Sequence, residues 1–541
     1  MCIFDSSLYK LACRVIAKIS VQWFALEQEL ERSLLKMALL EICLALVVIG
    51  YLIYKWSTAT FKTFEERNLY FEKPYPFVGN VGASALQRAS FQKQLTEFYE
   101  RTRQHKLVGF FNLRTPMITL NDPELIKKIC VKDFDHFPNH QLFIISKERL
   151  INDMLSVMRD QRWKHMRNTL TPVFTAAKMR NMFTLMNESF AECLQHLDTS
   201  AKSLPGRKGF EVDMKVLCNK LSNDIIATTA FGLKVNSYDN PENEFYEIGQ
   251  SLVFSRGLQF FKFMLSSLVP TIFSFLKLTI FDSAKVDYFV RLVVDAIRYR
   301  EKHNITRPDM IQLLMEAKKE SEDNWTDDEI VAQCFIFFFA AFENNSNLIC
   351  TTTYELLHNP DIQERLYEEI IETKEALNGA PLHYDAVQKM TYMDMVISES
   401  LRKWTLAAAT DRFCSKDYTL TDDDGTKLFD FKVGDRVNIP ISGLHWDDRY
   451  FPEPRKFDPE RFSDERKGDI VPYTYLPFGV GPRNCIGNRY ALMQVKGMLY
   501  NLLLHYKIEA SPKTTKDLWG SARGFNFTPR SGFWMHLVPR K

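Results

Sequence analysis

The amino-acid sequence predicts a mainly α-helical protein with small β-sheets and one N-terminal transmembrane helix. Three observations lead to this prediction: long stretches with helical spacing of apolar residues, few and short strand-like stretches, and one uncharged apolar stretch near the N-terminus. The chain has 541 residues, 46% hydrophobic and 25% charged, as expected for a protein that packs a large core. This composition excludes a disordered protein, a collagen and a multi-span transporter.

The charge balance and the cysteines exclude two further classes of protein. Lys and Arg total 69 against 67 Asp and Glu, whereas a dedicated nucleic-acid-binding protein has a strong basic excess. We therefore expect no nucleic-acid partner. Ten cysteines are too few for a disulfide scaffold, and the sequence has no CxxC pair of the kind found at zinc sites.

Residues 37–56 are predicted to form a transmembrane anchor. Residues 42–54 carry no charge, and Glu41 is the only acidic residue between Met37 and Tyr54. Twenty helical residues span roughly 30 Å, the thickness of the hydrocarbon core of a membrane. A buried core helix or a cleaved signal peptide would have a similar composition, but no small-residue cleavage site follows. Aromatic side chains that favour the membrane interface lie near one end: Tyr51, Tyr54 and Trp56.

The residues after the anchor indicate its orientation and the domain that it carries. By the positive-inside rule, the basic residues that follow place the rest of the chain in the cytosol: Lys55, Lys62, Arg67 and Lys73. We expect a linker at residues 57–77, because its segment Lys73-Pro74-Tyr75-Pro76-Phe77 cannot continue a helix. No internal repeat divides residues 78–541, which are expected to form one α-rich domain.

Helix signals are clearest in the second half of this domain. Thr326 and Glu329 form a capping-box pattern ahead of an apolar run, which predicts a helix from Thr326 to Asn359. A second helix should begin at Asn359-Pro360 and end at Asn378-Gly379. Further helices are expected near residues 393–404 and 488–504.

Strand signals are short, and one apolar region allows two interpretations. Residues 418–420 and 436–439, with the turn residues 422–425 between them, predict a β-hairpin. Residues 252–281 are rich in Phe, Leu and Ile, but Arg256, Lys262 and Lys277 make them a poor second membrane span. They form either core helices or a surface that dips into the bilayer and admits lipophilic ligands.

The most specific stretch is Phe478-Gly-Val-Gly-Pro-Arg-Asn-Cys-Ile-Gly487. Its glycines allow tight turns and the close approach of a flat ligand, and Arg483 could pair with an anionic group. Cys485 precedes a helical pattern, and a helix N-terminus stabilises a thiolate, which is a ligand for a soft metal centre. A structural cysteine in a glycine loop is the alternative. The glycine spacing does not fit the GxGxxG pattern of dinucleotide-binding loops.

This loop resembles that of the cytochrome P450 haem-thiolate monooxygenases. The family pattern F-x-x-G-x-R-x-C-x-G is matched by Phe478, Gly481, Arg483, Cys485 and Gly487. The resemblance implies the P450 fold and a haem cofactor, with Cys485 as the proximal iron ligand. A thiolate ligand pushes electron density onto the iron and favours O–O cleavage. The chain looks most similar to insect microsomal members of the detoxifying type.

Other family patterns extend the resemblance along the chain. Glu399 and Arg402 fit the E-x-x-R pattern, and with Arg461 they would form a buried triad that braces the cysteine loop. Trp163 and Arg167 fit the W-x-x-x-R helix whose side chains bind haem propionates. By resemblance, the haem site then comprises Trp163, Arg167, Arg412, Phe478, Arg483 and Cys485.

The distal helix departs from the family pattern [A/G]-G-x-[D/E]-T-[T/S], because it reads Ala340-Ala-Phe-Glu-Asn-Asn345. Glu343 keeps the acid, whereas Asn344 takes the place of the threonine whose hydroxyl suits proton delivery. By resemblance, Glu343 and Asn344 are the catalytic candidates. Thr405-Leu406 follows Trp404 where relatives usually carry prolines, and Gln494 stands where a glutamate is common.

Three functions stay open from these residues. The first is a monooxygenase that inserts one oxygen atom from O2 into lipophilic small molecules. By resemblance, it would take NADPH electrons from cytochrome P450 reductase, with cytochrome b5 as a further candidate partner. The second is a reductase-independent hydroperoxide isomerase or dehydratase, and the third is a non-catalytic haem protein that binds lipophilic ligands. The resemblance implies a single-pass protein of the endoplasmic reticulum membrane, in contact with membrane lipid and with a cytosolic catalytic domain. Candidate pocket residues are Phe335 to Phe339 and Phe525.

Residues 1–36 form an N-terminal extension that we do not expect in the mature chain. Three acidic residues, Glu27, Glu29 and Glu31, argue against a mitochondrial presequence, and Met37 could itself be a start. We predict that the mature protein begins at Met37. Peptide mapping of the purified protein's N-terminus checks this, and recovery of peptides from residues 1–36 would contradict it.

Overall fold

The structure is a computed structural model that describes residues 6–140, 149–203, 208–251, 257–320, 325–524, 527–529 and 531–540. Two compact units make up the chain, Met1–Lys62 and Thr63–Lys541.

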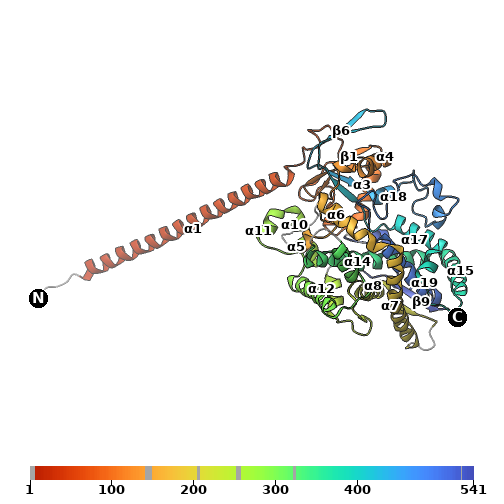
Figure 1. The fold of residues 1–541 in the computed structure, drawn as a ribbon. Helices are drawn as coiled ribbons and strands as arrows, with labels where there is room; N and C mark the ends of the chain where they lie inside the picture. Colours follow the sequence, from red (N-terminus) through yellow and green to blue (C-terminus); the bar gives the residue numbers. More distant parts are fainter. Residues whose placement is uncertain are drawn as a thin grey trace. The chain divides into compact units, whose positions relative to one another are not determined.

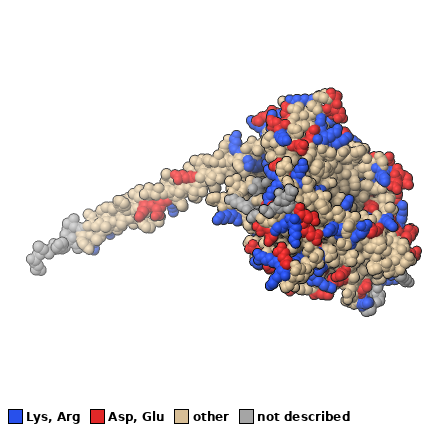
Figure 2. Space-filling view, in the orientation of Figure 1, with Lys and Arg blue, Asp and Glu red and all other residues tan. Residues whose placement is uncertain are grey.

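The first unit is dominated by one helix, α1 (Ser6–Thr58). It contains the predicted anchor and continues back through residues 6–36, which include no Pro or Gly to end a helix. Among the described residues, this is the one helix long and apolar enough to cross a membrane. The stretch between Glu41 and Lys55 carries no charge, and Figure 2 shows α1 as largely tan there. The chain therefore has an N-terminal helix compatible with a membrane anchor, as predicted.

The second unit begins earlier than the expected domain start at residue 78. Phe64 is fully buried, and its ring lies 5.0 Å from that of Phe111 and 6.0 Å from that of Phe71. Arg67 pairs with Asp435 at 2.7 Å. Residues 63–77, which we expected in a linker, therefore pack as part of the second unit. The burial of Phe64 gives this segment a hydrophobic attachment that its prolines did not reveal.

Helix α14 (Asp327–His358) runs through the middle of the second unit, as Figure 1 shows. The Thr326–Glu329 capping box opens it, as predicted, with Glu329 N–H donating to Thr326 Oγ1 and Thr326 N–H to Glu329 Oε2. It packs against α8 (Met214–Phe231), α12 (Ser283–His303), α17 (Thr391–Lys403) and α19 (Asn488–His505). Most of its side chains are buried, which explains why its apolar residues surround the helix instead of forming one stripe.

The predicted helices after α14 are confirmed. Helix α15 (Pro360–Ala376) ends ahead of Asn378 and Gly379, whose φ angles of 47° and 82° are left-handed. The other described helices are α2 (Gly82–Ala85), α3 (Phe91–Thr102), α4 (Pro123–Lys127), α5 (Arg149–Asn152), α6 (Asp160–Leu170), α7 (Ala176–Lys202), α9 (Glu244–Ser251), α10 (Gly257–Leu268), α11 (Pro270–Phe275), α13 (Met310–Glu320), α16 (Tyr384–Gln388), α18 (Ile441–His445) and α20 (Leu518–Ser521), with a π-helical turn η1 (Lys128–Lys132) and 3₁₀ turns η2 (Phe134–His136), η3 (Thr171–Phe174), η4 (Pro459–Phe462) and η5 (Lys467–Asp469).

Three small sheets complete the described part of the chain. The four-stranded sheet has the order β1 (Leu107–Asn112), β2 (Thr115–Leu120), β7 (Arg436–Ile439), β4 (Thr410–Phe413), with β2 and β7 parallel and the other pairs antiparallel. The three-stranded sheet is antiparallel, in the order β3 (Phe210–Asp213), β9 (Trp534–Pro539), β8 (Tyr506–Glu509). The third sheet is a hairpin of β5 (Tyr418–Thr421) and β6 (Lys427–Phe431).

The predicted hairpin is right in its turn and wrong in its second strand. Strand β5 pairs with β6 directly after the turn at residues 422–425, where Gly425 has a φ of 86°. Phe429 and Phe431 face inward on β6 and make it the nearer hydrophobic partner. Residues 436–439 form β7, which pairs with β2 and β4 instead.

The apolar region at residues 252–281 was expected to form either core helices or an apolar surface, and its described part contains both. Met264 and Leu268 of α10 pack against a buried cluster that includes Val108 and Phe110. On α11, Phe275 is 82% exposed, and Ile272 and Leu276 are exposed as well. Residues 252–256 lie outside the described residues. The described part therefore has one face on the core and an apolar face on the surface.

Candidate functional site

A cavity of about 480 Å³ lies between α14 and the loop that carries Cys485. Its walls are mostly apolar. Ala340, Ala341 and Asn344 line it from α14, and Phe478 and Cys485 line it from the loop. Helix and loop are far apart in the sequence, so the packing of α14 on α19, which follows the loop, brings the two walls together.

Two left-handed glycines give the cysteine loop its shape. Gly479 and Gly481 have φ angles of 73° and 71°, and a Cβ on Gly481 would lie 2.1 Å from the carbonyl oxygen of Cys130. The Cys485 N–H donates to the Phe478 carbonyl oxygen at 2.8 Å and closes the loop. A tight turn with no room for a side chain therefore sets the place of Cys485 at the cavity.

The Cys485 thiol lies at the cavity wall just before α19. Burial raises the pKa of the Cys485 thiol, whereas the Gly487 N–H and the Arg167 guanidinium lower it. The N–H group at the start of the helix thus favours the thiolate as expected, but it lowers the thiol pKa by less than burial raises it. A cation bound to the sulfur would supply the missing stabilisation.

Buried cations lie beside the cysteine, and their partners are mainly carbonyl oxygens. Arg483 donates to Pro138 O at 2.8 Å and to Met158 O at 2.9 Å, and its guanidinium lies 3.9 Å from the centre of the Trp163 ring. Burial and, to a lesser extent, the neighbouring Arg412 lower the pKa of Arg483 to about 9. An anionic group in the cavity would offset the free-energy cost of burying the Arg483 charge, so these N–H donors suit an anion.

Arg167 and Arg412 hold the same loop in different ways. Arg167 lines the cavity and donates to Asn484 O at 2.8 Å and to Asn484 Oδ1 at 2.7 Å. Arg412, on β4, is buried behind the loop and donates to Val480 O at 2.8 Å. Its Nε has no hydrogen-bond partner among the described residues. The structure therefore brings Trp163, Arg167, Phe478, Arg483 and Cys485 to the cavity and places Arg412 next to it.

The two catalytic candidates on α14 point in different directions. Asn344 lines the cavity, whereas Glu343 is not among its described lining residues. Glu343 Oε1 lies 3.1 Å from Lys215 Nζ on α8 and accepts from Asn347 Nδ2 at 3.2 Å. Successive residues of an α-helix are about 100° apart around its axis, so Glu343 can face α8 while Asn344 faces the cavity. The structure thus brings Asn344 but not Glu343 to the cavity.

The predicted aromatic pocket residues divide in the same way. Phe337 lines the cavity, whereas Phe335 and Phe338 are buried in the core. Phe525 lies outside the described residues. His140 lines the cavity as well, with Nδ1 3.1 Å from Asp411 O, and sequence reasoning missed it. No spacing in the sequence marks this histidine, because Asp411 belongs to a distant strand.

Comparison with known proteins identifies the family to which this site belongs. Within the described residues, no three His, Cys, Asp or Glu side chains gather in a group that could hold a metal ion. A model of the family "Cytochrome P450" matches residues 70–533. The chain belongs to the cytochrome P450 family. The predicted family, and with it haem-thiolate monooxygenase chemistry, is therefore confirmed.

Similar P450 proteins from insects and a mammal cover nearly the whole chain. The chain is 91% identical to cytochrome P450 9b2 of Drosophila melanogaster, over 93% of this chain and all of the relative. It is 44% identical to the probable cytochrome P450 9f2 of the same species, over 90% of this chain and 97% of the relative. Cytochrome P450 3A41 of Mus musculus is 34% identical, over 92% of this chain and 96% of the relative. The predicted insect affinity is confirmed.

The residues present fit the haem of a P450. Cys485 offers a sulfur to the iron, and the apolar walls suit a porphyrin. Trp163, Arg167 and Arg483 offer N–H groups to its propionates, and the buried charge of Arg483 forms no ion pair with a carboxylate of the described residues.

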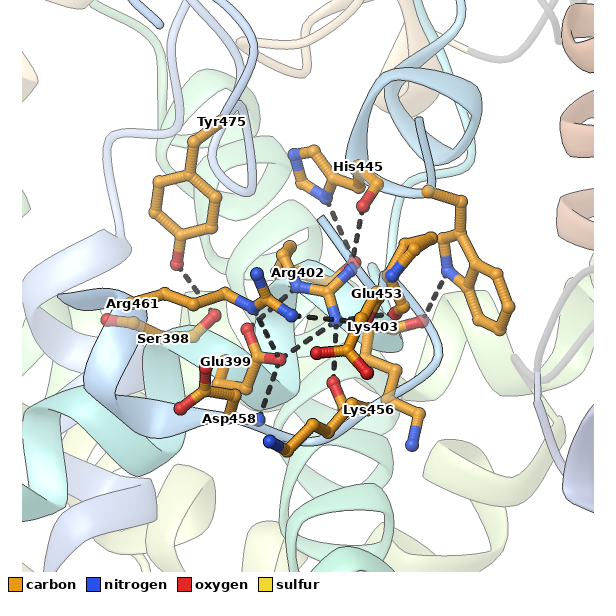
Figure 3. Close-up of polar contacts among 12 residues, drawn as sticks. Ser398, Glu399, Arg402, Lys403, His445, Glu453, Lys456, Asp458, Arg461 and Tyr475 are labelled. Atoms are coloured by element: carbon orange, nitrogen blue, oxygen red, sulfur yellow. Dashed lines mark hydrogen bonds and ion pairs between the residues drawn. The ribbon is translucent and has the colours of Figure 1, made fainter. Parts of the chain in front are cut away.

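The three residues of the predicted triad, Glu399, Arg402 and Arg461, lie together (Figure 3). Glu399 and Arg402 are fully buried, with Nε to Oε2 at 2.7 Å and Nη2 to Oε1 at 2.8 Å. Arg461, on η4, reaches Glu399 Oε1 only at 3.5 Å and donates to Glu453 O at 3.1 Å. The triad therefore consists of one close bidentate pair and one looser partner.

His445 connects this triad to the cysteine loop. Its Nε2 accepts from the Leu476 N–H at 2.8 Å, so Nδ1 carries the proton and donates to Arg402 O at 3.2 Å. Arg402 in turn donates to His445 O at 2.7 Å. Burial, with the nearby Arg402 charge, lowers the pKa of His445 to about 3. The neutral ring thus fixes the chain two residues before Phe478.

We predict that Arg402→Leu greatly reduces haem-bound protein, because Glu399 would be left as a buried charge at a cost of about 3–5 kcal/mol. Haem content per polypeptide and thermal unfolding measure the effect. The matched control is Arg180→Leu, since Arg180 and Asp385 form an exposed pair whose loss should change neither quantity much. Full haem incorporation in Arg402→Leu would refute the bracing role.

We predict that His445 makes the fold sensitive to acid. Because its folded-state pKa lies below the unfolded value of about 6.5, its contribution is complete above that value and is lost as the pH falls toward about 3. The loss approaches about 1.4 kcal/mol per pH unit inside this window. Unfolding measured from pH 7 to pH 4 should show a shallower dependence in His445→Gln. An unchanged slope would show that other groups set the acid sensitivity.

Proposed function

We propose that this P450 inserts one oxygen atom from O2 into lipophilic small molecules, with NADPH electrons delivered by a P450 reductase. The single observation that carries the proposal is the cavity between α14 and Cys485, with mostly apolar walls and two polar side chains, Asn344 and Asn345, lining it from the helix. An apolar cavity with few polar groups is the usual design of a site for apolar ligands. Cytochrome b5 is a second proposed electron donor.

The protein's part in this reaction follows from the lining side chains. The haem, held through Cys485 and through N–H groups of Trp163, Arg167 and Arg483, supplies the oxygen chemistry when bound. Ile336, Phe337 and Leu406 line the cavity and exclude water from the substrate.

Asn344 would orient a water molecule in the cavity. Its Nδ2 donates and its Oδ1 accepts, so the amide can hold a water but does not ionise to pass on a proton of its own. A carboxyl group can take and release a proton, and Glu343 is the nearest one along α14. Lys215 and Asn347 hold its Oε1 away from the cavity lining. We therefore assign Asn344 the orienting role and Glu343 the supply of protons through water.

We propose that residues 37–56 anchor the protein in the endoplasmic reticulum membrane in a single pass, with the catalytic domain in the cytosol. The uncharged stretch of α1 and the basic residues after it support this orientation. The exposed apolar side chains of α11 supply a second contact with lipid.

Asn344 also favours a second function. Asn344 can orient a water molecule but does not ionise to supply a proton. Such a side chain suits the rearrangement or dehydration of a lipid hydroperoxide, and these reactions need no reductase. A third function, the binding of lipophilic ligands without turnover, would use the same cavity. The three differ in their products, so one set of measurements separates them.

We predict that the unmodified protein, reconstituted with reductase and NADPH, forms oxygenated product from lipophilic probes and releases more peroxide than Asn344→Thr. The threonine hydroxyl both accepts and donates, so it should raise the ratio of product to peroxide. Product and peroxide are quantified in the same reactions. Asn181→Thr, on the exposed face of α7, is the matched control and should leave the ratio unchanged.

Product from the unmodified protein supports the monooxygenase. Peroxide alone, with product appearing only in Asn344→Thr, would overturn it. Consumption of a lipid hydroperoxide without NADPH would then indicate the second function, and its absence would leave ligand binding.

A further inference from the structure

Two of the departures from the family pattern meet inside the protein. Asn345 on α14 donates from Nδ2 to Oε1 of Gln494 on α19 at 2.6 Å. Gln494 donates from Nε2 to Oγ of Ser222 on α8 at 3.0 Å. The residues are 2%, 0% and 0% exposed, respectively. Three helices are thus joined by one short row of neutral side chains, which we name the amide clamp.

The two amide side chains of the clamp have complementary hydrogen-bonding groups. The family pattern has a threonine or serine where Asn345 stands, and a glutamate is common at the position of Gln494. Glutamate accepts hydrogen bonds and carries a charge, whereas Gln494 accepts from Asn345 and donates to Ser222 without a charge. A buried carboxylate needs charged or multiple hydrogen-bond partners, and an amide needs only these two contacts.

The replacement at position 345 matches the replacement at position 494. Asn345 has an N–H donor one atom farther from the backbone than a threonine hydroxyl, and that donor reaches Gln494 at a short distance. A threonine in its place would leave Oε1 of Gln494 buried without this donor. The two amides are therefore matched in length and in hydrogen-bonding groups.

The clamp lies where it can set the geometry of the reaction site. Asn345 lines the same cavity as Asn344 and Cys485. Gln494 is on α19, the helix that begins three residues after Cys485. A change in the spacing of α14 and α19 at this contact would change the distance between Asn344 and the cysteine sulfur.

We infer that Asn345 and Gln494 are a matched pair of positioning residues that, with Ser222, hold the Asn344 turn of α14 at a fixed height above Cys485. The effect on oxygen chemistry rests on the proposed function, whereas the coupling between the two side chains does not. Ordinary packing of two separately satisfied polar residues would give additive effects of mutation, so additivity is the outcome that distinguishes the two interpretations.

The test is a double-mutant cycle in the full-length haem-bound protein with Asn345→Ala, Gln494→Ala and the double variant. Each single variant should shift the unfolding equilibrium toward the unfolded state by roughly tenfold or more, because it leaves a buried amide without its partner. The double variant should shift it clearly less than the two single effects combined, because the second truncation removes the group that the first left unpaired. Asn501→Ala combined with Gln494→Ala is the matched control, because Asn501 bonds to Gly497 O on the same helix and its effect should add.

Two further readouts separate positioning from stability alone. The absorption band of the ferrous carbon-monoxide complex should show lost thiolate ligation in each single variant and little further loss in the double variant. The ratio of product to peroxide should follow the same order. Additive unfolding effects, or single variants with unaltered spectra, would overturn the inference. If no variant forms product, the proposed function fails, while the unfolding cycle and the spectra still decide the clamp.

Discussion

The carboxylate of Glu399 is buried out of water, and the site depends on how that charge is compensated. Removing an ion pair from water costs several kcal/mol per ion, so the structure tolerates it only with close partners. Arg402 meets the carboxylate with two parallel hydrogen bonds and then reaches the His445 carbonyl, and the His445 ring reaches the Leu476 N–H. If the cysteine loop moved, the hydrogen bonds that link it through His445 and Arg402 to the Glu399 carboxylate would break. The triad therefore makes the loop rigid without entering the cavity.

On the other wall of the cavity, the polar side chains on either side of Asn344 are also held by partners on neighbouring helices. The charged pair among these contacts points away from the cavity. Glu343 pairs with Lys215 on α8, and Asn345 is held by Gln494. Asn344 lies between them in the sequence and faces the cavity. The neighbours of Asn344 are thus tied to other helices, so the direction of its own side chain is set by a well-fixed turn of α14.

Local patterns predicted much of the fold and those residues of the site that belong to short sequence motifs. The capping box found the start of α14, and the cysteine loop with its helix was found because all its determinants lie within a few residues. Contacts between distant segments left no such signal. The pairing of β7 with β2, the packing of Phe64, the Lys215 partner of Glu343 and the place of His140 each depend on a residue far along the chain. The helical period likewise could not show which of Glu343 and Asn344 faces the cavity.

The adjacent asparagines Asn344 and Asn345 look alike in the sequence, but their surroundings give them different tasks. The amide N–H of Asn345 is engaged by Gln494 at 2.6 Å, so replacing it alters a buried contact between helices. Asn344 faces the cavity, so replacing it alters what a water or a substrate meets there. Substitution at 344 therefore changes the proton chemistry with the helix spacing kept, and substitution at 345 changes the spacing with the Asn344 side chain kept. A threonine at 344 is compatible with this chain because the departure at 345 is compensated by Gln494 and does not depend on its neighbour.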